Sequence, residues 1–176
     1  MDDPKLKELR KLVGQREKLI YEAVKAGMLA DLPREDQLYA RAIQEHMDLK
    51  HVHNALEFVD LREGEQYEIT ADGDMVNPLA HLAVHAAVKG QIAEDPAVRE
   101  AFDKMVATGT SAHHAEHVLG ALLMEEQWEA GHADDAGEDP TRALIVYKGK
   151  VKKLVWDSAY RKKLTRQFTD DHSAFE

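Results

Sequence analysis

The sequence of 176 residues contains no cysteine, and this absence excludes disulfide bonds, thiolate zinc sites, iron–sulfur clusters and a cysteine nucleophile. Its three serines do not lie in a nucleophile elbow, which argues against a serine hydrolase. A glycine-rich loop that cradles phosphate and a dinucleotide-binding fingerprint are also missing. These absences leave the ten histidines as the most conspicuous chemical feature.

Long apolar segments are absent as well. The longest apolar run, residues 79–88, is short and contains two histidines, so it cannot span a bilayer. The N-terminus is acidic and is followed by a charged amphipathic stretch. No signal peptide fits this pattern, and we expect a cytoplasmic protein without a membrane partner. A formal net charge of -10 argues against a general nucleic-acid-binding protein.

Aromatic residues make up only 6% of the chain, whereas alanine, leucine, glutamate and lysine are plentiful. This balance favours helices. Hydrophobic residues account for 44% and charged residues for 32%, which is the composition of a globular protein and not of a disordered one. The length suits about one domain and is sufficient for a buried core.

Apolar residues recur at helical spacing in four segments. The segments are residues 4–26, 32–59, 77–109 with a break or kink at Asp95-Pro96, and a fourth that begins after a cap at Thr110 or Ser111. Between the second and third segments, residues 67–70 can pair with residues 75–76 as a short hairpin. We therefore expect an all-α fold, an up-down four-helix bundle over residues 4–131.

Residues 132–176 form a second region, in which an acidic linker precedes a basic C-terminal arm. The segment 143–156 fits either a hairpin or a helix, and the hairpin is favoured. Residues 148–166 contain eight basic residues and one acidic residue. We expect this basic run to pack against the acidic body of the protein itself. The alternative is a contact arm for nucleic acid or an acidic partner.

Two histidine pairs stand out between residues 81 and 117. His81 and His85 are four residues apart, and so are His113 and His117, so each pair projects from one face of its helix. Both pairs fall on stripes that we expect to face the core. Four inward histidines would place many polar atoms in that core, and each unpaired one costs about 1–3 kcal/mol.

A carboxylate also falls where the second helix should be apolar. The apolar residues of segment 32–59 recur every three or four positions, and Glu45 stands where one of them should be. A small rotation of the helix would replace Glu45 with His46 at that position. Divalent metal ions would satisfy these side chains together, because bundle interiors are where dinuclear carboxylate–histidine sites are built. The alternatives are a structural polar network without metal and a stripe that faces solvent. We expect His53 one face away, and His51, His132 and His172 at the surface.

The stretch from Asn77 to His85, with Gln91 beyond it, resembles the centre of an uncharacterised bacterial family, domain of unknown function 1841. Further matching positions are Leu32-Pro33, Glu45-His46, and the run from His113 to His117 with Glu125, Trp128 and Glu129-Ala130. The resemblance covers roughly residues 10–131, and the chain departs from the family pattern at His114 and over residues 46–51. The family has no assigned activity, so the resemblance implies no particular reaction.

The sequence thus predicts a metal-binding helical bundle with a dinuclear site of iron, manganese or zinc, since nitrogen and oxygen ligands without sulfur suit these metals. The candidate ligands are His81, His85, His113 and His117, with Glu116 as a bridging or histidine-orienting carboxylate and Glu45 or His46 from the second helix. Activated water or dioxygen would give hydrolysis or oxidation, and a metal or oxygen sensor fits the same ligands. The alternative is a metal-free interaction module with a buried histidine network. The expected partners are the metal, a small molecule or dioxygen, and a second copy in a homodimer.

Overall fold

The computed structural model describes residues 4–47, 49–59, 68–69, 75–132 and 140–170. These residues contain eight α-helices, one 3-10 helix and a two-stranded sheet, and they form two compact units. The first unit lies within residues 1–86 and the second within residues 87–174. The helix α4, Pro78–Glu94, contributes its first half to the first unit and its second half to the second. None of the described helices is both long and apolar enough to cross a membrane.

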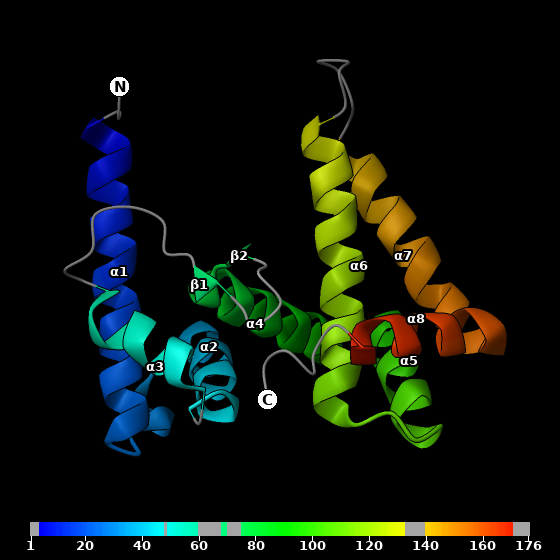
Figure 1. Cartoon of the computed structure of the whole chain (residues 1–176), viewed down its shortest axis with the longest axis horizontal. Helices are drawn as coiled ribbons and strands as arrows, with labels where there is room; N and C mark the ends of the chain where they lie inside the picture. Colours follow the sequence, from blue (N-terminus) through cyan, green and yellow to red (C-terminus); the bar gives the residue numbers. More distant parts are fainter. Residues whose placement is uncertain (1–3, 48, 60–67, 70–74, 133–139, 171–176) are drawn as a thin grey trace. The chain divides into compact units, whose positions relative to one another are not determined.

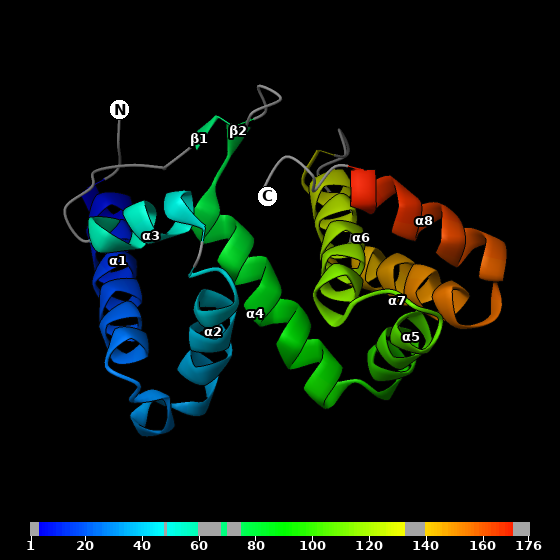
Figure 2. The same ribbon diagram turned by 60° about the horizontal axis from the view of Figure 1, so that its bottom comes forward.

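The first unit is built on a long N-terminal helix. This helix, α1 (Pro4–Lys25), packs against α2 (Arg34–Glu45) and α3 (Lys50–Glu57), and Figure 2 shows it beside them. The chain leaves α1 through Gly27, whose φ of 71° lies in the left-handed region that glycine adopts without strain. The elements of this part are α1 (Pro4–Lys25), the 3-10 helix η1 (Leu29–Asp31), α2 (Arg34–Glu45) and α3 (Lys50–Glu57). Their core contains Ile20, Tyr21, Val24, Ala40, Ala42, Ile43, Val52, Leu56 and Leu82.

The prediction of one continuous helix over residues 32–59 is wrong, because the helix is interrupted at His46. The His46 imidazole reaches back to the Ala42 carbonyl, with Nδ1 2.6 Å from the oxygen. The backbone N–H of His46 donates instead to the carbonyl of Ile43, which tightens the last turn. A side chain thus satisfies a carbonyl that a continuing helix would have used, and α3 starts afresh at Lys50.

A short hairpin precedes α4, as the sequence predicts. Strand β1, Glu68–Ile69, pairs antiparallel with β2, Met75–Val76, with Glu68 opposite Val76. The predicted ends of the first strand, Tyr67 and Thr70, lie outside the described residues.

The second unit consists of the end of α4 and four further helices, which Figure 1 shows lying together. Helix α5 (Pro96–Ala107) begins where Asp95 accepts a hydrogen bond from the backbone of Ala97, so the predicted break at Asp95-Pro96 is confirmed. Helix α6 (Ala112–His132) begins after Ser111, whose hydroxyl accepts from the backbone of His114. The remaining helices are α7 (Pro140–Trp156) and α8 (Ser158–Asp170).

The C-terminal region is helical, so the favoured hairpin over residues 143–156 is wrong. Tyr147, Val151 and Leu154 follow one another at helical spacing and are almost fully buried. Helix α7 packs on α5 and α6, and α8 packs on α6 and α7. The all-α class is therefore confirmed, but an up-down four-helix bundle is not. The predicted division into residues 4–131 and 132–176 does not coincide with the two units.

The basic run of α7 and α8 pairs with acidic residues of its own unit. Lys148 Nζ lies 3.0 Å from a carboxylate oxygen of Asp95, and Lys150 Nζ lies 2.5 Å from Glu126 and 3.1 Å from Glu125. Desolvation lowers the pKa of Lys150, but the bonds to Glu126 and Glu125 outweigh this effect and raise it. These contacts agree with the expectation that the basic run packs against the acidic body of the protein.

Candidate metal centre

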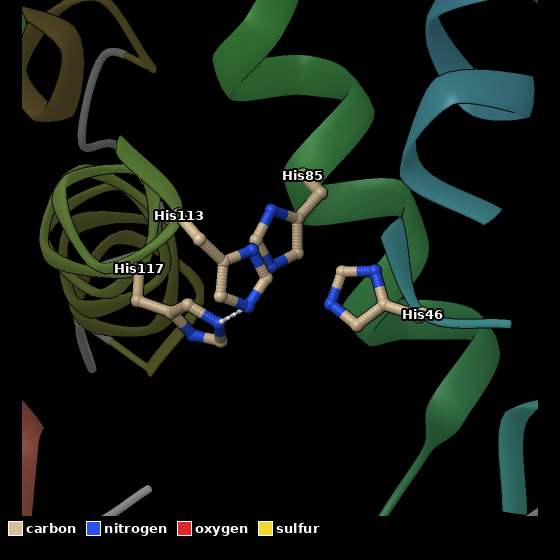
Figure 3. A group of neighbouring side chains, drawn as sticks. All are labelled: His46, His85, His113 and His117. Carbon is tan, nitrogen blue, oxygen red and sulfur yellow. Dashed lines mark hydrogen bonds between the residues drawn. The ribbon is translucent and has the colours of Figure 1, made fainter. Parts of the chain in front are cut away.

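Three histidines of the first unit touch one another, and we call His46, His81 and His85 the first histidine group. Their ring centroids are 4.6 to 4.8 Å apart, and two of the three contacts are edge-on. His46 follows the last residue of α2, whereas His81 and His85 lie one turn apart on α4. His46 is 1% exposed and His85 3% exposed. Figure 3 shows these two rings, His46 at the end of α2 and His85 on α4. Their polar rings therefore replace aliphatic side chains next to the core residue Leu82.

The hydrogen bond to Ala42 fixes the tautomer of His46. A carbonyl oxygen only accepts, so the Nδ1 atom that lies 2.6 Å from it carries the hydrogen. In the neutral ring the lone pair is then on Nε2, which lies 3.0 Å from Nε2 of His81. Metal-ligating histidines ordinarily have such an outer partner on the second ring nitrogen. The His46 ring is thus held in the tautomer and orientation that a metal ligand needs.

A second histidine group lies on α6 and consists of His113 and His117. Their Nε2 atoms are 2.9 Å apart, and Figure 3 shows this contact as a dashed line. The ring centroids are 4.5 Å apart. His113 is exposed and His117 half-buried. The spacing of four residues places both rings on one face of the helix, as predicted.

The two Nε2 separations are those of adjacent ligands on one ion. Two nitrogen atoms bound at about 2.1 Å are about 3.0 Å apart when they subtend a right angle, and about 3.4 Å apart in a tetrahedron. The observed 3.0 and 2.9 Å fit the right-angled arrangement. The same separation is that of an N–H···N hydrogen bond, which is what a metal-free network would use.

Glu116 lies between the two histidines of the second group in the sequence. Its side chain is buried, and it forms an ion pair with Lys89 of α4. Lys89 Nζ lies 2.7 Å from Glu116 Oε1, and the two side chains are 12% and 9% exposed. His113, Glu116 and His117 together have the H-x-x-E-H spacing found on helices of one class of metallopeptidase. Lys89 was not among the site residues predicted from the sequence. Its position four residues after His85 on the same helix face was the signal that could have found it.

The structure places the two candidates on the second predicted helix in different surroundings. Glu45 is the last residue of α2 and its side chain is exposed, whereas His46 is buried and belongs to the first histidine group. Within the first unit, ligand atoms of His46 and His85 lie within 4.8 Å of each other, and within the second unit the same holds for His113 with Glu116 and with His117. Such groupings of His and Glu side chains could hold a metal ion.

The predicted inward stripe of α6 is wrong. The residues of α6 that are buried in the second unit are Ala115, Glu116, Val118, Leu119, Gly120, Leu122 and Glu126. This buried face is rotated from the predicted one, because α6 packs on α5, α7 and α8 through the positions beside the histidines. Trp128 and Met124, which continue the stripe of His113 and His117 at helical spacing, are 67% and 45% exposed.

Four further histidines were predicted to lie away from the candidate site. The hydroxyl of Tyr21 forms a hydrogen bond with Nδ1 of His53, whose side chain is exposed on α3. The predictions for the side chains of His51, His132 and His172 fall on side chains that the structure does not describe.

Comparison with known proteins assigns the chain to a family without a known activity. No curated protein and no solved structure matches it. Residues 16–146 match the family described as domain of unknown function DUF1841. This match spans well over half of the sequence and includes both histidine groups. The chain therefore belongs to the DUF1841 family.

Proposed function

We propose that this protein binds a pair of divalent metal ions, one at each histidine group. The observation that carries the proposal is the hydrogen bond between His46 and the carbonyl of Ala42. This bond leaves the lone pair of the neutral ring on Nε2, 3.0 Å from Nε2 of His81. An ion can accept lone pairs from both rings at once, and the outer carbonyl orients the ligand.

The second histidine group supports the same proposal independently. His113 and His117 lie on a different helix, yet their Nε2 atoms have nearly the same separation as those of His46 and His81. Imidazole nitrogens with a nearby carboxylate, and without sulfur, suit iron, manganese or zinc. Under this proposal the ligands of the first ion are His46 and His81, with His85 as the third histidine of that group. The ligands of the second ion are His113 and His117, and Glu116 orients their rings.

The chemistry that the ions would supply is the activation of water or of dioxygen. The ligand set is compatible with hydrolysis, with oxidation and with a sensing role. The H-x-x-E-H spacing around Glu116 favours hydrolysis, since a carboxylate next to ligating histidines can serve as a general base for water.

The direct test is the metal content of untagged protein purified without chelators, measured by elemental mass spectrometry before and after loading with iron, manganese or zinc. We expect about two equivalents per chain. His81→Ala should abolish binding at the first histidine group and so lower uptake to about one equivalent. His117→Ala should do the same at the second group. His53→Ala and His114→Ala are matched controls and should retain both equivalents.

Metal removal gives a second readout. A ligand that binds only the native state stabilises it by about 3 kcal/mol at a hundredfold excess over its Kd. Chelation should therefore lower the Tm of the loaded protein. Absence of uptake by the wild-type protein, or full uptake by both alanine variants, contradicts the proposal.

One observation favours a second candidate, a metal-free interaction module. The Nε2 separations of 3.0 and 2.9 Å are ordinary hydrogen-bond distances, so the histidines can form a structural network. In that case a chelator leaves the Tm unchanged, and His81→Ala lowers stability without any change in metal content.

A further inference from the structure

We infer that the outer face of α7 binds the surface of a bilayer that contains anionic lipid, with the helix lying along the membrane. The residues of this outer face are Ile145, Val146, Lys148, Lys152, Lys153 and Trp156. All of them belong to the second unit, and none is a member of a histidine group. The inference is therefore independent of the proposed metal binding.

The first step is the division of α7 into a core side and a solvent side. On the core side, Tyr147, Val151 and Leu154 are spaced by four and three residues and are almost fully buried. Ile145 and Trp156 are eleven residues apart, which is close to three helical turns, and both are exposed on the opposite side. Figure 1 shows α6 along one side of α7, and α7 packs on α5 and α6. The outer face is thus the side of α7 that the second unit leaves to solvent.

The second step is the apolar character of this face. Ile145 is 66% exposed, its neighbour Val146 is 39% exposed, and Trp156 is 73% exposed. These side chains lie at the two ends of the face, about 16 Å apart. Helices that lie in a membrane interface likewise combine tryptophan and aliphatic side chains with lysines. Tryptophan in particular favours the level of the lipid headgroups.

The third step is the charge of the face. The sequence of α7 contains no acidic residue, and three lysines of the outer face lie between its apolar ends. Lys148 is 3.0 Å from Asp95, and Lys153 is 3.9 Å from Asp157. Lys152 is exposed and has no ion-pair partner among the described residues. Anionic headgroups would supply that partner, and juxtaposed lysines strengthen the attraction to such a surface.

The net charge of -10 does not prevent this contact. At physiological ionic strength the Debye length is about 8 Å, so acidic side chains on distant elements act weakly at the membrane surface. The expectation of no membrane partner concerned a segment that spans the bilayer, and a helix that lies on the surface needs no such segment. Nucleic acid would use the same lysines, but it offers no apolar phase to Ile145 and Val146. A bilayer accounts for both features of the face.

The test measures sedimentation of the full chain with vesicles, in the presence of a chelator so that metal cannot bridge protein and lipid. The vesicles contain either phosphatidylcholine alone or an equimolar mixture of phosphatidylcholine and phosphatidylserine. We expect binding only to the mixed vesicles and release as the salt concentration rises. Lys152→Gln should weaken binding about fivefold, and Ile145→Ser about tenfold. Lys104→Gln and Val106→Ser make the same changes at exposed positions of α5 and should bind like wild type.

Fluorescence provides a second readout without any change to the outer face. The chain contains two tryptophans, so Trp128→Phe leaves Trp156 as the single emitter. Its emission should shift to shorter wavelength when the mixed vesicles are added, because the indole enters a less polar environment. Absence of binding to the mixed vesicles, binding without this shift, or unchanged affinity in both Lys152→Gln and Ile145→Ser overturns the inference. Binding of a single-stranded DNA oligonucleotide by a chain that ignores the vesicles overturns it as well.

Discussion

Removal of Lys150 should destabilise the second unit, because the lysine neutralises a carboxylate buried between α6 and α7. Glu126 is 4% exposed, and its Oε1 lies 2.5 Å from Lys150 Nζ. Loss of one partner of a buried ion pair costs about 3–5 kcal/mol. Lys150 is itself 27% exposed, so solvent screens part of the interaction. We therefore expect Lys150→Met to lower the free energy of unfolding by about 2 kcal/mol.

The partner variant separates the charge effect from the loss of packing. When both groups are replaced, as in Lys150→Met with Glu126→Leu, no carboxylate remains in the core, and well-packed apolar substitutes for a buried pair are often neutral. The double variant should recover at least half of the lost stability. The assay is unfolding in guanidinium chloride followed by circular dichroism, with a chelator present so that metal does not contribute. A Lys150→Met protein as stable as wild type would refute the reasoning, because the pair would then behave like a surface ion pair.

Two further predictions concern the start of α5 and the core of the first unit. The hydrogen bond from Lys148 and the backbone N–H of Ala97 hold the pKa of Asp95 below its usual value of 3.8. A carboxyl group whose pKa is lower in the folded state stabilises the fold at any pH above its pKa in the unfolded state. This stabilisation is lost as the pH falls through the pKa of the folded state. Asp95→Ala should thus cost about 1 kcal/mol at pH 7 and progressively less below pH 4, as measured by urea unfolding at several pH values. Leu56 is fully buried, so Leu56→Ala should cost about 3 kcal/mol in the same assay, and a loss below about 1 kcal/mol would mean that the site collapses around the smaller side chain.

Boundaries with a local chemical cause could be predicted from the sequence. Gly27 ends α1, Asp95-Pro96 separates α4 from α5, and Ser111 caps α6, and each of these signals acts through its own neighbouring backbone. The break at His46 could not be predicted in this way. It depends on an imidazole that replaces a backbone donor to Ala42, and sequence periodicity does not register such a bond.

The candidate site shows the same distinction. The histidine pairs were predictable, because the spacing of four residues fixes their relation within each helix. The choice between Glu45 and His46 was not, because it depends on where α2 ends. The buried face of α6 was also predicted wrongly, since Met124 and Trp128 continue the stripe of His113 and His117 in the sequence but are exposed in the structure. Which side of a helix is covered depends on the neighbours that it packs against, here α5, α7 and α8.

The continuity of α4 has a consequence for any attempt to divide this protein. A cut between Ala86 and Ala87 would leave helical ends of about nine and eight residues, which are too short to persist in water without tertiary contacts. Each half would also lose the hydrogen-bond partners that the other half of the helix provides across the cut. A fragment that is meant to hold the first histidine group should therefore extend to Glu94. A fragment of the second unit should begin at Asn77, which accepts hydrogen bonds from the backbone of Leu79 and Ala80 at the start of α4. The two halves of the protein are thus best expressed as overlapping pieces that both contain this helix.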